Sequence, residues 1–165
     1  MFMQVNVLLL KQDDPKKCTA AKLVKYNLAR DVKKISKNSL VLDPFSPKTL
    51  LRNDRKLVNS ITAIDCSWTR ADQTFTKQYL GLRRKLPPLF AGNPVNYSKI
   101  GKLTSVEAIS GALFILGLND LALELLDKFK WGHTFYELNK ELINDYSKIE
   151  SEEEIPQLLK EYNIS

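Results

Sequence analysis

The sequence of 165 residues and 18.9 kDa is long enough for one domain or for two small lobes that share a core. Hydrophobic residues make up 44% of it and charged residues 27%, which excludes a wholly disordered chain. Residues 1–100 carry 19 basic and 7 acidic side chains, a net charge of +12, whereas residues 101–165 carry 6 and 12, a net charge of −6. This asymmetry predicts a polyanionic partner for the first part of the chain, and nucleic acid is the first candidate.

Several kinds of site are excluded by the residue types that the sequence lacks. One histidine, His133, and two cysteines 48 positions apart, Cys18 and Cys66, make no zinc-binding spacing and no disulfide framework. The six glycines fit neither a dinucleotide-binding fingerprint nor a P-loop. The longest apolar run, 112–118, is too short to span a membrane, and residues 1–10 lack the features of a signal peptide. We therefore expect a cytoplasmic protein with no metal centre.

Strands and helices are expected to alternate in the first part of the chain. Apolar, β-prone runs predict strands at residues 5–10, 39–42 and 59–64, and a short strand or extended segment at 86–91. One helix is predicted to begin at Thr19, as its N-cap, and to continue its apolar face through Leu28 and Val32. A second helix is predicted from Trp68 to about Leu82. This alternation indicates an α/β fold with a mostly parallel sheet.

The second part of the chain has the pattern of a helical lobe. Thr104 and Glu107 have the spacing of a capping box, which predicts a helix start. Further helices are expected over 121–129, from Trp131–His133 onward, and over 152–161. The sequence therefore predicts two lobes, an α/β lobe over 1–91 that is basic and faces RNA, and a mainly helical lobe over 92–165.

Asp65 lies where a predicted strand ends and a predicted helix begins. Ligands of open α/β sheets gather at the carboxyl ends of strands, so Asp65 is a candidate base or ligand contact. The alternative is that it only caps the following helix, which is the commoner role of such a residue. Trp68 and Ala71 share a face of that helix and form either a flat apolar slot or an ordinary part of the core.

Two predicted helix starts, at Thr19 and at Thr104–Ser105, present backbone N–H groups that bind anions. Each is either a simple cap or, if the two meet, half of a clamp for a carboxylate or phosphate. A set of basic side chains has the composition of a surface that follows an RNA backbone, or of a plain solvated face. Its members are Lys16, Lys17, Lys22, Lys25, Arg83, Arg84 and Lys85.

Five longer motifs, in one order along the chain, resemble the small-subunit ribosomal RNA aminocarboxypropyltransferase family, the 18S rRNA enzyme of eukaryotes and its archaeal relatives. They are DCSW at 65–68 with Ala71, RRKLPPL at 83–89, NPVNY at 93–97, KLTSVEA at 102–108 and FKWGHTF at 129–135. The similarity extends from about Lys17 to about Asn139, and the short chain resembles the archaeal members. The resemblance implies a SPOUT-like fold with a knotted chain and a cofactor bound between the lobes.

The resemblance also implies a reaction. Members of this family transfer the 3-amino-3-carboxypropyl group of S-adenosylmethionine (SAM), not its methyl group, to N3 of a hypermodified uridine or pseudouridine in small-subunit rRNA. Methylthioadenosine is released, and no metal takes part. The implied partner is the rRNA or a pre-ribosomal particle, with no membrane, and we expect a monomer.

The SAM-binding residues implied by the motifs are Thr19, Leu42, Pro44, Ile64, Trp68, Ala71, Leu89, Gly101, Leu103, Ser105 and Ala108. Thr19 and the Ser105 backbone would hold the methionine carboxylate, Trp68 and Ala71 would enclose the methyl group, and the Ile64 carbonyl would meet the ribose. The remaining apolar side chains would flank the adenine. Asp65 would act beside the sulfonium, as a general base or by stabilising its charge. Gly101 departs from the family, which often has an aromatic residue there.

Two alternatives share parts of this pattern. A SPOUT-type RNA methyltransferase would use the same cofactor and release S-adenosylhomocysteine. A non-catalytic assembly factor would bind pre-ribosomal RNA through the basic lobe, in a salt-sensitive way that does not depend on SAM.

Overall fold

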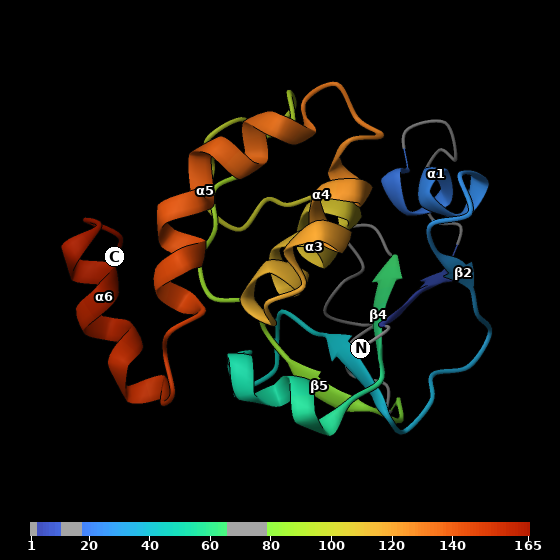
Figure 1. Cartoon of the computed structure of the whole chain (residues 1–165), viewed down its shortest axis with the longest axis horizontal. Helices are drawn as coiled ribbons and strands as arrows, with labels where there is room; N and C mark the ends of the chain where they lie inside the picture. Colours follow the sequence, from blue (N-terminus) through green and yellow to red (C-terminus); the bar gives the residue numbers. More distant parts are fainter. Residues whose placement is uncertain (1–2, 11–17, 66–78) are drawn as a thin grey trace.

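The structure, a computed structural model, describes residues 3–10, 18–65 and 79–165. A five-stranded, wholly parallel sheet in the order β2-β1-β4-β3-β5 lies at its centre (Figure 1). The strands are β1 (Gln4–Leu9), β2 (Arg30–Asp31), β3 (Ser39–Leu42), β4 (Ser60–Asp65) and β5 (Leu82–Arg84). The α/β class and the mostly parallel sheet predicted from the sequence are therefore confirmed.

The register of the strands determines which residues reach the carboxyl edge of the sheet. β4 lies between β1 and β3, and its last residue, Asp65, pairs with Leu9 of β1. On the other side β3 stops at Leu42, opposite Ala63. Because β4 continues past the end of β3, Asp65 lies at an edge that β3 does not cover.

Alternating side chains bury both faces of the sheet, as expected for parallel strands. On one face, Val7, Leu40 and Ile61 belong to the main hydrophobic core. On the other, Val41 and Ile64 belong to a smaller cluster that also contains Leu8 and Ile35. The apolar runs that predicted these strands are thus explained by burial on two sides.

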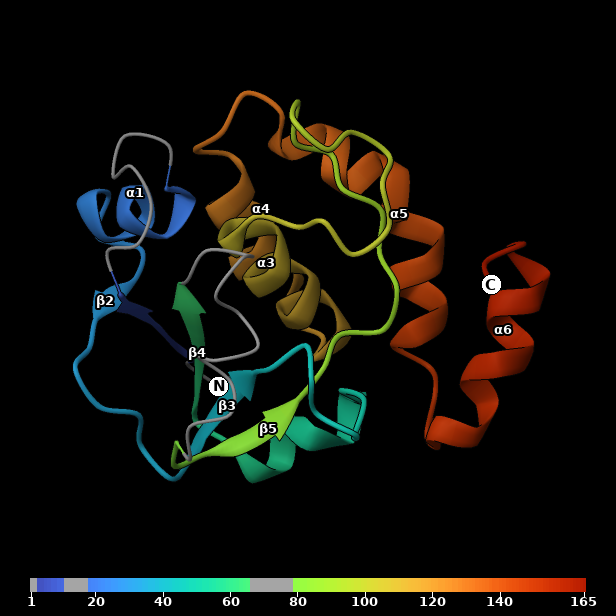
Figure 2. The ribbon, with the colours of Figure 1, turned by 180° about the vertical axis from the view of Figure 1, so that it is seen from behind.

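Helices lie over the main-core face of the sheet and beyond it. They are α1 (Thr19–Lys25), α3 (Ser105–Ile115), α4 (Asn119–Leu126), α5 (Gly132–Tyr146) and α6 (Ile155–Glu161), with 3-10 turns η1 (Arg52–Leu57) and η3 (Glu152–Glu154). α3 packs against β4, α1, α4 and α5, and nine of its 11 residues are buried. Figures 1 and 2 show α5 between this central helix and α6, which lies at the edge of the molecule.

Several predicted boundaries are confirmed and two are wrong. The strand at 39–42, the helix start at Thr104 and a helical end of the chain over 152–161 are confirmed. The cap of α1, however, is Cys18, whose Sγ accepts a hydrogen bond from the Ala21 N–H at 3.3 Å. α1 also ends at Lys25, because Asn27 takes a left-handed backbone (φ +60°), so Leu28 and Val32 lie beyond the helix.

The segment between β4 and α3 also departs from prediction. Residues 66–78 lie outside the described part of the chain, but Leu82 begins a strand and does not end a helix, because it pairs with Leu40 of β3. The predicted extended segment at 86–91 forms no strand; Phe90 alone makes an antiparallel bridge, to Ile100. Pro87 and Pro88 have no N–H to donate, which keeps that segment out of the sheet.

Candidate active site

Asp65 is the point at which three elements meet. Its Oδ2 accepts a hydrogen bond from the Cys18 thiol at 3.1 Å, and its Oδ1 accepts one from the Ser105 hydroxyl at 3.2 Å. Cys18 caps α1 and Ser105 is the first residue of α3, so the end of β4 is tied to the starts of both helices. The carboxylate itself is only partly buried.

Thr19 completes the connection between the two helix starts. Its Oγ1 accepts a hydrogen bond from the backbone N–H of Val106, the second residue of α3, at 3.1 Å. Thr19 and Val106 are 87 positions apart in the chain. The structure therefore brings the two helix starts together, and the binding of an anion there stays a prediction.

Cys18 was not predicted to belong to this site. Burial raises the pKa of its thiol to about 11, and the neighbouring Asp65 carboxylate acts in the same direction, partly offset by the hydrogen bond from Ala21. The group is therefore a neutral thiol at pH 7, and its hydrogen can bond to the carboxylate. The only feature of the sequence that points to Cys18 as part of this site is its position immediately before Thr19.

A second carboxylate, Glu107, is wholly buried on the other side of the α3 start. It accepts hydrogen bonds from the backbone N–H groups of Gly92, Asn93 and Thr104 at 2.6, 3.2 and 2.9 Å. The Asn93 amide and the Thr104 hydroxyl also donate to it, at 2.7 and 3.0 Å. The capping box was predicted, but the bonds that fasten residues 92–93 to α3 were not.

The described residues of the predicted SAM set lie in a few places. Leu42 and Pro44 lie at and just beyond the end of β3, Ile64 lies at the end of β4, and Leu89 is buried in the core. Thr19, Leu103, Ser105 and Ala108 lie at or near the starts of α1 and α3. Trp68 and Ala71 lie outside the described residues.

Two residues of α3 stand out by their accessibility. Ser105 and Ala108 are the two members of this 11-residue helix that are not buried. They are three positions apart and therefore share a face. The accessible face of the α3 start is thus formed by two residues of the predicted SAM set, next to Asp65.

Gly101 has a left-handed backbone, and the space beside its Cα is empty. Its φ is +77°, and a Cβ at this position would meet no atom within 4 Å. Its backbone N–H donates to the Leu89 carbonyl at 3.0 Å. The departure from the aromatic residue of the family therefore suits the local backbone, which a glycine adopts without strain.

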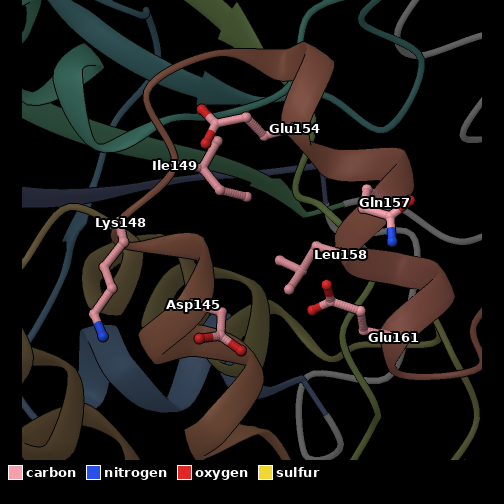
Figure 3. Close-up of a pocket in the computed structure, with 7 residues that line it drawn as sticks. All are labelled: Asp145, Lys148, Ile149, Glu154, Gln157, Leu158 and Glu161. Carbon is pink, nitrogen blue, oxygen red and sulfur yellow. The ribbon is translucent and has the colours of Figure 1, made fainter.

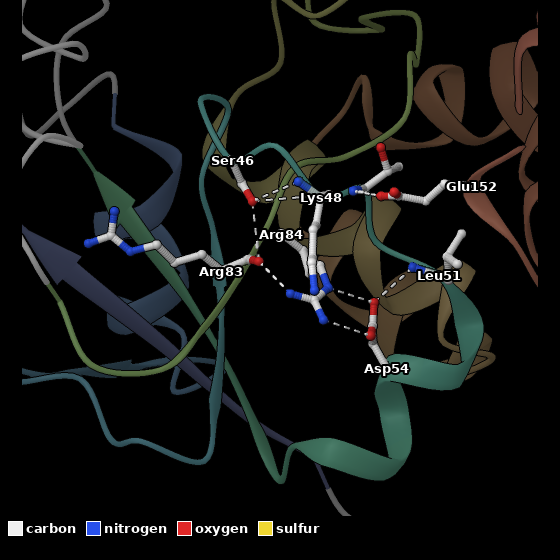
Figure 4. Close-up of polar contacts among 8 residues, drawn as sticks. Ser46, Lys48, Leu51, Asp54, Arg83, Arg84 and Glu152 are labelled. Atoms are coloured by element: carbon white, nitrogen blue, oxygen red, sulfur yellow. Dashed lines mark hydrogen bonds and ion pairs between the residues drawn. The ribbon is translucent and has the colours of Figure 1, made fainter.

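The predicted RNA-binding residues differ in their surroundings. Lys25 is exposed on α1, whereas Arg83 pairs with Asp43 at 3.3 Å. Arg84 donates from Nε and Nη2 to the Asp54 carboxylate at 3.2 and 3.4 Å, and only 13% of its side chain is exposed (Figure 4). The Arg84 guanidinium thus holds β5 against η1, and its contact with RNA stays a prediction. Of the rest, Lys22 and Lys85 are half-buried, and Lys16 and Lys17 lie outside the described residues.

A groove of about 390 Å³ lies elsewhere, between the end of α5 and α6 (Figure 3). It is lined by Asp145, Lys148, Ile149, Glu154, Gln157, Leu158 and Glu161. Three carboxylates and one ammonium group make it unsuited to an anionic nucleic acid. It contains none of the predicted site residues.

The site at Asp65 has the chemistry that SAM requires. The α3 start and the Thr19 hydroxyl suit a carboxylate, and the Asp65 carboxylate suits a positively charged sulfonium or ammonium group. Across the described ranges, no group of three or more His, Cys, Asp or Glu side chains could hold a metal ion. In the same residues, no helix has both the length and the apolar character needed to cross a membrane.

Two family models match the chain. One, described as "Ribosome biogenesis protein, C-terminal", matches residues 40–163, and one described as "Possible Fer4-like domain in RNase L inhibitor, RLI" matches residues 3–36. An iron–sulfur cluster needs several cysteine ligands, and residues 3–36 contain one cysteine, Cys18. The second match therefore does not indicate a cluster in this chain.

Proteins of named activity are similar to nearly the whole chain. A 16S rRNA aminocarboxypropyltransferase of Methanococcoides burtonii is 44% identical over 163 residues, which are 96% of this chain and 94% of that protein. One of Saccharolobus islandicus is 44% identical over 161 residues, 96% and 95% of the two chains. The SAM-dependent rRNA:acp-transferase Tsr3 of Vulcanisaeta distributa has a solved structure that superposes with a TM-score of 0.88 at 34% identity, over 100% of this chain and 91% of that one. The chain therefore belongs to the 16S rRNA aminocarboxypropyltransferase family.

Proposed function

We propose that this protein transfers the 3-amino-3-carboxypropyl group of SAM to N3 of a uridine or pseudouridine in 16S rRNA, as a step of ribosome biogenesis. The observation that carries the proposal is the partly exposed Asp65 carboxylate, which Cys18 and Ser105 orient where the starts of α1 and α3 meet. Family membership supplies the reaction, and this arrangement supplies a place for it.

The α3 start is the proposed binding place of the methionine carboxylate. α3 has 11 residues, and the backbone N–H groups of its first turn carry the positive end of its dipole. Thr19 accepts a hydrogen bond from Val106, so its own hydroxyl hydrogen remains to be donated to a bound carboxylate. Ser105 is placed to contribute its backbone N–H.

The adenosine part is proposed to lie along the edge where β3 and β4 end. Leu42 and Pro44 follow the end of β3, and Leu103 and Ala108 flank the α3 start. With Leu89 they form an apolar set suited to a purine, and the Ile64 carbonyl is proposed to accept from the ribose. The backbone of Gly101 borders the same set.

The choice of the transferred group is proposed to depend on position. SAM supplies a sulfonium with three electrophilic carbons, and attack occurs at the carbon that faces the acceptor. If Trp68 and Ala71 enclose the methyl group, as the resemblance implies, the carboxypropyl carbon is left open to the RNA. A C–N3 bond then forms, the C–S bond breaks, and methylthioadenosine leaves.

Asp65 is proposed to take the proton that N3 loses, or to stabilise the sulfonium charge before transfer. Its two hydrogen-bond donors, the Cys18 thiol and the Ser105 hydroxyl, hold the carboxylate in one orientation. Such preorientation is what an acid–base group needs to act within hydrogen-bond distance of its substrate.

The finer features of the family are proposed for this chain as well. They are a SPOUT-like knotted chain, a basic RNA-facing lobe over 1–91, a helical lobe over 92–165, and a cytoplasmic monomer that acts on rRNA or a pre-ribosomal particle. The division into lobes is supported by the chain order, since β1 to β5 lie before residue 92 and α3 to α6 after it.

The experiment that tests the proposed function incubates the protein and small-subunit RNA with SAM labelled in the carboxyl carbon or, in a separate batch, in the methyl group. The expected result is RNA labelled from the carboxyl batch alone, with methylthioadenosine as the second product. Label from the methyl batch alone would overturn the proposal in favour of a methyltransferase.

No label from either batch, with RNA and small-subunit particles both tried, would favour the non-catalytic RNA-binding protein. Such a protein binds RNA equally with and without SAM. RNA titrations in the absence of SAM and at saturating SAM therefore complete the distinction.

A further inference from the structure

The segment from Asn93 to Lys102 presents an unusual group of apolar side chains to solvent. Val95 is 85% exposed, Tyr97 56% and Ile100 45%. These are three of the seven large hydrophobic side chains that the described part of the chain exposes, and they lie within six consecutive residues. Clustered exposure of this kind marks an interaction surface more often than a single exposed residue does.

This loop, 93–102, is firmly built. The backbone N–H of Ala91 donates to the Lys99 carbonyl at 2.8 Å, and that of Ser98 donates to the Ala91 carbonyl at 2.7 Å. The Asn93 side chain accepts from the Asn96 N–H at 3.0 Å, and Asn93 is itself held by the buried Glu107. The exposure of the apolar side chains is therefore a property of an ordered turn.

The sequence that contains the loop carries a net positive charge. Residues 85–106 contain three lysines, Lys85, Lys99 and Lys102, and no aspartate or glutamate. The next acidic residue, Glu107, is wholly buried and directs its carboxylate at the loop backbone. A segment with an exposed aromatic ring, with lysines and with no exposed carboxylate of its own is suited to a nucleic acid strand whose bases stack while its phosphates meet the lysines.

The loop is connected through the chain to the proposed reaction site. It leads directly through Leu103 and Thr104 into Ser105, whose hydroxyl lies 3.2 Å from Asp65. Figure 2 shows the loop running over the start of α5 and then returning to the start of α3. The loop and the start of α3 are thus consecutive in the chain, so an RNA segment that reaches Asp65 can extend onto the loop.

We propose that the loop 93–102 is a stacking platform for the RNA substrate, on which Tyr97 packs against an unpaired base of the RNA segment that contains the acceptor nucleotide. Val95 and Ile100 widen the apolar surface, and Lys99 meets a phosphate. The acceptor base must be unpaired for its N3 to be accessible, so a surface that favours unpaired RNA suits this reaction. The inference rests on the proposed function, because it assumes that the substrate is RNA.

The test measures the affinity of the full-length protein for a single-stranded fragment of small-subunit rRNA and for the same sequence as a duplex. Tyr97→Ala is expected to weaken single-strand binding about 5- to 150-fold, the range for loss of one stacked base, and duplex binding less than about twofold. Tyr97→Trp keeps a stacking face and should retain the affinity, whereas Tyr97→Leu keeps apolar area alone and should not. Leu57→Ala, at a side chain 60% exposed just before β4, is the matched control and should change neither affinity.

The outcomes separate this inference from the proposed function. SAM affinity should be the same in all four variants, and carboxypropyl transfer by the unmodified protein tests the function itself. Equal single-strand binding by Tyr97→Ala and the unmodified protein would overturn the stacking platform even if transfer occurs. A loss confined to assembled particles, with naked RNA unaffected, would also overturn it and would assign the loop to a protein partner.

Discussion

Two carboxylates flank the start of α3, and the structure holds them in opposite ways. Glu107 is wholly buried, and three backbone N–H groups, an amide and a hydroxyl donate to it. Asp65 is partly exposed and accepts two side-chain hydrogen bonds. A carboxylate offers about four lone pairs, so Glu107 has no capacity left whereas Asp65 does. The number of donors thus separates a carboxylate that holds a loop from one that is available for a substrate.

The largest effect on the reaction is expected at the partly exposed carboxylate, Asp65. Asp65→Asn removes the negative charge and the proton acceptor, so carboxypropyl transfer should fall by about 10²- to 10⁴-fold, the usual contribution of acid–base catalysis. The midpoint of thermal unfolding should change little, because the amide oxygen introduced by this substitution can still accept from Ser105. Single-turnover transfer at saturating SAM measures the effect, and half or more of the normal rate would end the proposed role of Asp65.

The buried carboxylate, Glu107, should matter for the stability of the fold. Glu107→Ala leaves the N–H groups of Gly92, Asn93 and Thr104 without their acceptor, so the free energy of unfolding should fall by about 3–5 kcal/mol. Urea denaturation measures the change. Glu137→Ala is the control, since its side chain is 55% exposed and pairs with Lys140; it should cost less than about 0.5 kcal/mol. Equal losses in the two variants would contradict the distinction.

Two basic residues differ in a similar way, since Arg84 is nearly buried and paired with Asp54 whereas Lys25 is exposed. Arg84→Met leaves the Asp54 carboxylate without its paired guanidinium, and the free energy of unfolding should fall by about 1–3 kcal/mol. Lys25→Met, at an exposed position, should leave stability unchanged but lower the slope of log affinity for RNA against log salt by about 1. Denaturation and salt titrations of RNA binding, applied to both variants, measure the two effects. A full-sized salt effect at Arg84 without loss of stability would show that the ion pair is dispensable.

The smallest effect concerns the thiol that donates to Asp65. The pKa of Cys18 is raised from 9.0 to about 11, so the folded state holds this proton more tightly than the unfolded state does. The resulting stability is complete below pH 9 and is lost as the pH rises toward 11. Cys18→Ser retains a donor and a cap acceptor but does not titrate, so its stability should fall less over that interval. Denaturation midpoints of both proteins at about pH 8 and about pH 10.5, on either side of the unfolded-state pKa, measure this difference. An equal loss of stability in Cys18→Ser and the unmodified protein would contradict the prediction.

Local patterns in the sequence were sufficient for much of the fold. The β3 strand was predicted from the three consecutive apolar residues that follow Ser39, and the start of α3 from Thr104 and Glu107, because a capping box is closed by bonds within three residues. The α6 region was predicted from a weak amphipathic pattern in the same way. The predicted strand ending at Asp65 and the site at its carboxyl end also rested on local signals.

The composition of the site was decided only by the tertiary structure. The bond from Cys18 to Asp65 joins residues 47 positions apart, and that from Val106 to Thr19 joins residues 87 apart. Likewise Arg84 finds Asp54 across 30 positions, so a residue predicted to face RNA serves the fold. Local sequence patterns do not encode these contacts. The contacts form because the parallel register of the sheet places the end of β4 beside the starts of α1 and α3. The sequence by itself determined which chemical groups were present, and the packing of α1 and α3 at the edge of the sheet decided which of them meet.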